Sequence, residues 1–132
     1  MDYISTWSEK NCNEAKTEFK DKIEYLSSFI TPDAVVLDAG AGVGFFTEIM
    51  SRKAKKVYSL DFSPKMLQKV RDRVKRKRLT NVTVVEGDIT HMPFDSAFFD
   101  LVVSTSTLYY VFETEEAIAE IYRVLKKEAR QF

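Results

Sequence analysis

The sequence predicts an α/β fold in which helices cover both faces of an open, doubly wound sheet. Apolar runs typical of buried strands alternate along the chain with segments of helical periodicity. Such alternation favours parallel strands joined by right-handed crossovers. The length of 132 residues is that of one domain with one modest core. We therefore expect a single domain over residues 1–132, with residues 1–30 as an N-terminal helical or lid segment.

The first half of the chain has the pattern of helix, strand, helix, strand. Residues 14–30 carry apolar side chains at helical spacing, and Pro32 ends that helix. Residues 34–39, AVVLDA, form a continuous apolar run, which is typical of a strand buried on both faces. A helix over 43–54 and a second strand over 56–61 follow.

The second half continues the alternation. A helix is expected over 63–78, with Ser63 as its N-cap and a proline at its first position. The next two strands are expected over 81–88 and 98–105. A last helix over 113–129 begins with acidic residues and has basic residues near its end, in agreement with the helix dipole.

The composition narrows the function classes. The 20 basic and 20 acidic side chains cancel, so the net charge favours neither a nucleic acid nor a membrane as partner. The single cysteine, Cys12, allows no internal disulfide and is typical of a reducing compartment. The first residues do not resemble a signal peptide, and no apolar run approaches the roughly 20 residues of a membrane span. We expect a cytoplasmic protein with no metal site.

The glycine-rich run after the first strand points to a ligand. A phosphate-binding P-loop needs Lys-Ser or Lys-Thr after its last glycine, but two phenylalanines follow Gly44. Gly40 and Gly42 fit a dinucleotide fingerprint, whereas its third glycine is replaced by Phe45. Asp38 would also be a poor neighbour for a pyrophosphate. These departures weaken the dinucleotide interpretation and leave it open.

Five segments together resemble one family. VLDAGAGVGFFT is similar to motif I of the class I S-adenosylmethionine-dependent methyltransferases. The other matches follow in the family's order: VYSLDFSPKML, EGDITHMPF, FFDLVVSTSTLYYV and EIYRVLK. The resemblance covers roughly residues 30–127. It implies a three-layer Rossmann-like fold, with about four parallel strands in the order 3-2-1-4.

The resemblance also implies S-adenosylmethionine as cofactor and S-adenosylhomocysteine as product. The residues expected to bind this cofactor are Asp38, Gly40, Ala41, Gly42, Gly44, Asp61, Phe62, Met66, Asp88, Ile89 and Ser104. The glycine-run backbone and the next helix would approach the methionine carboxylate, with Asp38 on the ammonium side. Asp61 would accept both ribose hydroxyls.

The adenine would lie beyond the third strand. Asp88 would accept a hydrogen bond from the adenine amino group, and the Ile89 N–H would donate to the ring. Phe62 and Met66 would cover the adenine face. Taken singly, each of the three aspartates also fits a turn at a strand end. Their joint spacing favours cofactor binding.

The acceptor side is less specific. Methyl transfer is an in-line displacement from sulfur, and alignment supplies much of its rate, so no base is required. The resemblance places Ser104, Thr105, Tyr109 and Tyr110 at the mouth of the active site. Tyr109 and Tyr110 are weak catalytic candidates, because helix packing explains them equally well. His91 is a further weak candidate, in a turn of surface type.

Two segments outside these motifs have competing explanations. Trp7 is either part of a lid over the cofactor or a core anchor. Residues 69–78, KVRDRVKRKR, have the charge density of a nucleic-acid contact. A solvated helix face explains that run better, since the chain is neutral overall and the run contains no aromatic residues.

The end of the chain departs from the family. The family's sheet normally has seven strands and its last helix commonly ends Leu-Lys-Pro-Gly-Gly, whereas this chain reads VLKKEARQF. We therefore expect a C-terminally truncated sheet in which the fourth strand has a bare apolar edge. A second copy, giving a homodimer, or a partner chain would cover it.

The sequence thus leads to two main hypotheses. The first is a methyltransferase with a small-molecule acceptor favoured over RNA or protein. The alternative is a methyltransferase-like binding module that needs self-association or a partner, or is inactive. A nicotinamide-dependent oxidoreductase is disfavoured by Phe45 and by the spacing of Asp38.

Overall fold

The computed structural model describes residues 20–104 and 114–131. Residues 20–27 are helical. The elements that follow are β1 (Val35–Ala39), α2 (Phe45–Ser51), β2 (Lys56–Asp61), α3 (Pro64–Arg76), β3 (Val82–Glu86), β4 (Phe99–Val103), α4 (Thr114–Val124) and β5 (Leu125–Gln131). The predicted alternation of strands and helices is confirmed.

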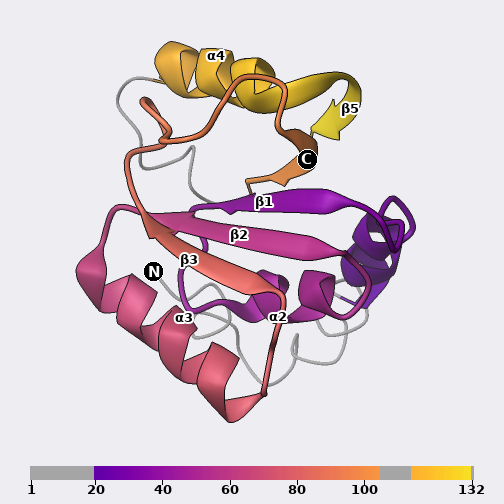
Figure 1. Ribbon diagram of the computed structural model, residues 1–132, viewed down its shortest axis with the longest axis vertical. Coiled ribbons are helices and arrows are strands. Elements are labelled where there is room, and N and C mark those ends of the chain that lie inside the picture. Colours follow the sequence, from indigo (N-terminus) through magenta and orange to yellow (C-terminus); the bar gives the residue numbers. More distant parts are fainter. Residues whose placement is uncertain (1–19, 105–113, 132) are drawn as a thin grey trace, which may run out of the picture.

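The strands form one parallel sheet in the order β3-β2-β1-β4-β5. The chain moves outward from β1 to β3 and then returns to the other side of β1, where it adds β4 and β5 (Figure 1). Val36 in β1 pairs with Val57 of β2 on one side and with Leu101 of β4 on the other. The predicted order 3-2-1-4 is therefore confirmed.

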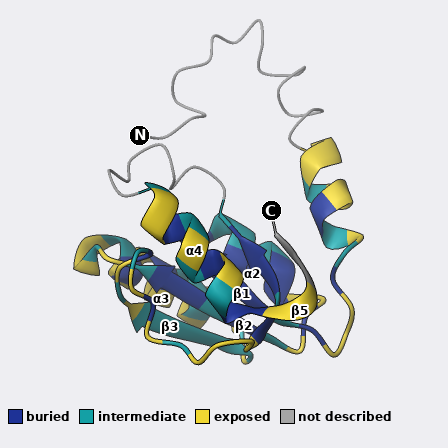
Figure 2. Ribbon diagram, turned by 90° about the horizontal axis from the view of Figure 1, so that it is seen from above, coloured by how far each residue is buried: buried dark blue, intermediate teal, exposed yellow. Residues whose placement is uncertain are grey.

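The core lies on both faces of the sheet, which gives the three expected layers. α4 covers one face, and α2 and α3 lie on the other (Figure 1). Phe99, Ile121 and Val124 belong to the buried cluster beneath α4, whereas Leu26 and Met50 belong to the cluster on the opposite face. Buried residues run along the central strands, and exposed residues lie on the outer sides of the helices (Figure 2).

The expected course of the chain after β4 is wrong. Instead of a helix over 113–129, α4 ends at Val124 and the chain continues directly as β5. β5 pairs with β4, from Phe99 opposite Leu125 to Leu101 opposite Arg130, with an irregular register between them. The sheet therefore has five strands, and the β4 edge expected to be bare is covered by this chain itself.

Two helix ends show how local sequence sets the boundaries. α2 begins at Phe45 and ends at Ser51, so it is shorter than the predicted 43–54. Its start is delayed because the glycine loop occupies the residues up to its N-cap. α3 begins as predicted, with the Ser63 hydroxyl accepting a hydrogen bond from the Met66 N–H.

Within residues 20–104 and 114–131, none of the helices has the length and apolar character needed to cross a membrane.

Candidate functional site

The predicted polar residues meet at one edge of the sheet. Because the strands are parallel, their carboxyl ends all lie at this edge. Asp38 lies near the end of β1, and Asp61 is the last residue of β2. Asp88 follows β3, and Ser104 follows β4. In open α/β sheets this edge is where ligands bind.

The glycine loop after β1 depends on left-handed backbone at three positions. The φ angles of Gly40, Gly42 and Gly44 are 79°, 57° and 86°. Residues with a Cβ rarely adopt this conformation, so the glycines permit the tight path of the loop. The N–H groups of Gly40 and Ala41 donate to the Leu60 carbonyl at 2.7 and 3.0 Å, which ties the loop to the end of β2. A Cβ built on Gly42 has nothing within 4 Å, so the loop has open space there.

Asp61 links the glycine loop to the start of α3. Its Oδ2 accepts from the Gly42 N–H at 3.1 Å, and its Oδ1 accepts from the Ser63 N–H at 3.0 Å. Each carboxylate oxygen has a second lone pair, so both oxygens can accept one further hydrogen bond. Asp61 is only partly buried, so the residue is in part open to a ligand at this edge.

Asp38 is a buried carboxylate held by a chain of hydroxyls. Its side chain is 1% exposed, and its Oδ2 accepts from the Thr47 hydroxyl at 2.7 Å. Since the Thr47 proton is used there, the Ser59 hydroxyl is the donor in its 2.5 Å contact with Thr47. Burial raises the pKa of Asp38 to about 6, the Thr47 hydrogen bond opposes this, and nearby Asp61 adds to it.

An arginine from α3 supports the glycine loop. Arg73 Nε donates to the Val43 carbonyl at 3.0 Å, and its Nη1 contacts Glu48 Oε1 at 3.0 Å. The side chain of Glu48 is largely buried, so this ion pair is shielded from water. A Cβ on Gly44 would lie 3.4 Å from Arg73 Cδ, which shows how closely α3 approaches the loop.

The loop after β3 carries the residues expected at the adenine. Asp88 Oδ1 accepts from both the N–H and the hydroxyl of Thr90, at 2.9 and 2.8 Å, and these bonds lower the pKa of Asp88. Its Oδ2 accepts no hydrogen bond from the described residues, so that oxygen can bind a ligand. Phe62 is 76% exposed at the same edge, and Met66 is half-buried.

Ser104 carries a polar group that the described residues leave unsatisfied. Its Oγ is buried at the end of β4 and has no hydrogen-bond partner in the described part of the chain. Buried hydroxyls are normally paired, and a ligand at this edge would supply a partner. His91 lies in an exposed turn and forms a bridge with Asp88. Trp7, Thr105, Tyr109 and Tyr110 lie outside the described residues.

The sequence analysis missed the residues that hold the site together. Thr47, Ser59 and Arg73 are common polar types without a motif of their own. One signal was present at Ser59, which interrupts the apolar run VYSLD, where a buried strand would have an apolar side chain. No comparable signal distinguished Arg73 from its basic neighbours in α3.

The donor and acceptor set fits S-adenosylmethionine. A buried carboxylate at β1 suits an ammonium group, and the spare lone pairs of Asp61 suit a ribose diol. Oδ2 of Asp88, which accepts no hydrogen bond from the described residues, suits an adenine amino group. The glycine loop leaves open space beside Gly42 and has no lysine, so it lacks the cation of a phosphate-binding P-loop.

Comparisons with known proteins agree with this chemistry. Residues 37–132 match the family model described as "Methyltransferase domain". The chain is 38% identical over 97 residues to a chloroplast 2-methyl-6-phytyl-1,4-hydroquinone methyltransferase of Arabidopsis thaliana. It is also 38% identical over 92 residues to a demethylmenaquinone methyltransferase of Thermobifida fusca. These alignments cover 72% and 70% of this chain but only 28% and 39% of the relatives.

A solved structure shows the same likeness. Phosphoethanolamine N-methyltransferase 1 of Haemonchus contortus, in complex with phosphoethanolamine and S-adenosylhomocysteine, superposes with a TM-score of 0.74. It is 29% identical in sequence, and the match covers 84% of this chain and 24% of that one.

Proposed function

This chain belongs to the methyltransferase domain family of class I S-adenosylmethionine-dependent enzymes, and on that premise we propose that it transfers a methyl group from S-adenosylmethionine to a small molecule. The observation that carries the proposal is the convergence of Asp38, Asp61 and the glycine loop at one sheet edge. The cofactor supplies the methyl group on its sulfonium. The chain spans less than half the length of the curated relatives it matches.

The residues of the chain bind and orient in this proposal. Asp61 accepts the ribose hydroxyls while its backbone contacts keep the glycine loop in place. Asp38 attracts the ammonium group, and the hydroxyl of Thr47 helps keep the carboxylate ionised. Ser104 contributes a hydroxyl at the end of β4. Alignment of donor and acceptor provides the catalysis, so no side chain needs to take a proton in the transfer itself.

The names of the relatives support a proposal for the acceptor class. Both curated relatives are named for methylating a hydroquinone or a demethylmenaquinone, so we propose a small aromatic ring of quinol type as the first acceptor to test. RNA and protein are the competing acceptors. An acceptor panel with radiolabelled S-adenosylmethionine would separate these classes, and methylation of RNA or protein alone would contradict the proposal.

Location and self-association stay predictions. The single cysteine supports a cytoplasmic location.

The homodimer is expected from a bare β4 edge, but β5 covers that edge. Pairing through β5 would bring together exposed Lys126, Lys127 and Glu128, and charges of this kind disfavour strand addition. Light scattering of the chain measures its oligomeric state.

Calorimetry with S-adenosylhomocysteine tests the proposed function. The wild-type chain is expected to bind it and to bind NAD weakly or not at all. Asp61→Ala is expected to weaken binding strongly, because a charge-assisted pair of hydrogen bonds is lost. Asp72→Ala is the matched control, since Asp72 is exposed on α3 and contacts Gln68. Unchanged affinity in Asp61→Ala, or stronger binding of NAD, would contradict the proposal.

A further inference from the structure

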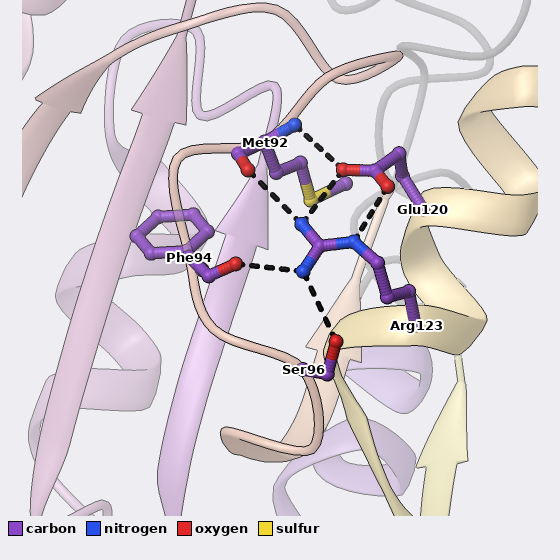
Figure 3. Close-up of polar contacts among 5 residues, drawn as sticks. All are labelled: Met92, Phe94, Ser96, Glu120 and Arg123. Atoms are coloured by element: carbon purple, nitrogen blue, oxygen red, sulfur yellow. Dashed lines mark hydrogen bonds and ion pairs between the residues drawn. The ribbon is translucent and has the colours of Figure 1, made fainter.

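Arg123, near the end of α4, holds the loop between β3 and β4 by its backbone (Figure 3). Its Nη2 donates to the Met92 carbonyl at 3.0 Å, and its Nη1 donates to the Phe94 carbonyl at 2.8 Å. Nη1 also contacts Ser96 Oγ at 3.3 Å. The planar guanidinium thus spans several residues of one loop, which a lysine cannot do with the same geometry.

Glu120 completes this arrangement from the preceding turn of α4. Its two carboxylate oxygens face Arg123 Nε at 2.6 Å and Nη2 at 2.9 Å. Oε2 of Glu120 also accepts from the Met92 N–H at 2.7 Å. Both backbone polar groups of Met92 are therefore bound by the pair (Figure 3). The Glu120 side chain is 16% exposed, so this is not an ordinary solvated surface pair.

Met92 is joined to the residues expected at the adenine. The His91 N–H donates to the Asp88 carbonyl at 3.1 Å, which closes a tight turn over 88–91. Ile89, within this turn, and Met92, directly after it, are both buried in the cluster that contains Ile121 of α4. The place of Asp88 at the sheet edge therefore depends on where Met92 is held. Neither Glu120 nor Arg123 bonds Asp38 or Asp61, and the contact between this segment and Asp61 is the Gly87 N–H, which donates to the Asp61 carbonyl at 3.0 Å.

We infer that Glu120 and Arg123 are positioning residues for adenine recognition: they hold the 88–96 loop where Asp88 and Ile89 can bind the base. The inference rests on the proposed function and deepens it. The pair acts through the loop backbone and does not touch the cofactor. Its effect is thus expected to be largest at the adenine end of the site.

The test compares two ligands that differ only at the base. S-adenosylhomocysteine has the amino group that Asp88 would accept, whereas S-inosylhomocysteine has an oxygen there. Calorimetry of the wild-type chain is expected to show a preference for the adenine ligand. In Arg123→Met this preference is expected to fall about fivefold, which is the effect of one hydrogen bond. Arg76→Met is the matched control, because Arg76 is exposed on α3 and forms no ion pair with a described residue.

Two further variants and a second measurement cover the case in which Arg123→Met does not fold. Glu120→Gln keeps the size of the side chain and removes its charge. Arg123→Lys keeps the positive charge and removes the planar guanidinium group. Hydrogen exchange is expected to speed up over 88–96 in each variant, while β1 and β2 keep their protection.

The outcomes are distinct. Equal loss of affinity for both ligands would show that the pair has only a general structural role. An unchanged preference with unchanged exchange would show that the pair does not hold the loop. Either result would overturn the inference. If the wild-type chain binds neither ligand, the proposed function fails and the inference fails with it. If the wild-type chain binds both ligands equally, only the inference fails.

Discussion

The hydroxyl of Thr47, in α2, donates a hydrogen bond to Oδ2 of Asp38 at the end of β1 across 2.7 Å. This bond joins the first helix after the glycine loop to the carboxylate that precedes the loop. Because Asp38 is buried, the bond stabilises the ionised carboxylate where water cannot.

Thr47→Val tests the importance of this bond. We expect it to reduce the free energy of unfolding by about 1–2 kcal/mol, because the buried Asp38 loses its donor. We also expect weaker binding of S-adenosylhomocysteine at pH 7, since the pKa of Asp38 rises further. Ser51→Ala is the control, as Ser51 is buried in the same helix and bonds the Glu48 carbonyl. Equal effects of the two variants on affinity would contradict this prediction.

The pH dependence of binding should follow Asp38. Burial raises the pKa of its carboxyl from 3.8 to about 6, so below pH 6 the neutral form attracts an ammonium group poorly. Affinity for S-adenosylhomocysteine is expected to be about tenfold lower at pH 5 than on the plateau above pH 7. Calorimetry across this range measures it. Asp38→Asn should flatten the profile, whereas His91→Asn, a substitution in the exposed turn after β3, should not.

The raised pKa of Asp38 also determines how the free energy of unfolding changes with pH. The folded chain binds the Asp38 proton more tightly than the unfolded chain, because the folded pKa is the higher one. The contribution of Asp38 to the free energy of unfolding is therefore complete below pH 3.8 and is lost as the pH rises to about 6. In denaturant titrations, Asp38→Asn should become more stable relative to wild type across that window. If the difference in free energy of unfolding between wild type and Asp38→Asn does not change with pH, the titration of Asp38 does not contribute to the pH dependence of stability.

The left-handed backbone at Gly42 predicts a difference between two substitutions. A Cβ at this position meets nothing within 4 Å, so the cost of a side chain comes from φ of 57° alone. Gly42→Ala is expected to destabilise the fold by about 1–2 kcal/mol. Gly42→Asn should cost less, because asparagine tolerates this conformation. Thermal unfolding of both variants measures the difference, and a larger loss for asparagine would point to a clash instead.

Substitutions of two phenylalanines should affect the stability of the fold and the binding of the cofactor separately. Phe99 is fully buried and packs edge-to-face against Tyr58 and Phe94, so Phe99→Ala is expected to cost about 3–5 kcal/mol. Phe62 is 76% exposed, so Phe62→Ala should leave the melting temperature nearly unchanged. If Phe62 covers the adenine, that variant should still bind S-adenosylhomocysteine more weakly. Unchanged affinity would remove Phe62 from the site.

The strand order around β1 could be predicted because it depends on long apolar runs and on motifs with fixed spacing. β5 could not, because LKKEARQ has the charge and composition of a helix end, and pairing with β4 outweighs that local preference. In the site, the aspartates and glycines were predictable because they stand at strand ends. Thr47 and Arg123 were not, since their partners are brought to them only by the packing of a helix against the sheet.

The position of β1 at the centre of the sheet has a consequence for biosynthesis. Val36 pairs with Val57, which follows soon after it, but also with Leu101, far along the chain. Contacts between such distant segments carry a high loop-closure entropy and form late. A ribosome-bound chain that ends before β4 lacks one neighbour of the strand that carries Asp38. We therefore expect the nascent chain to acquire its cofactor only after β4 has left the exit tunnel.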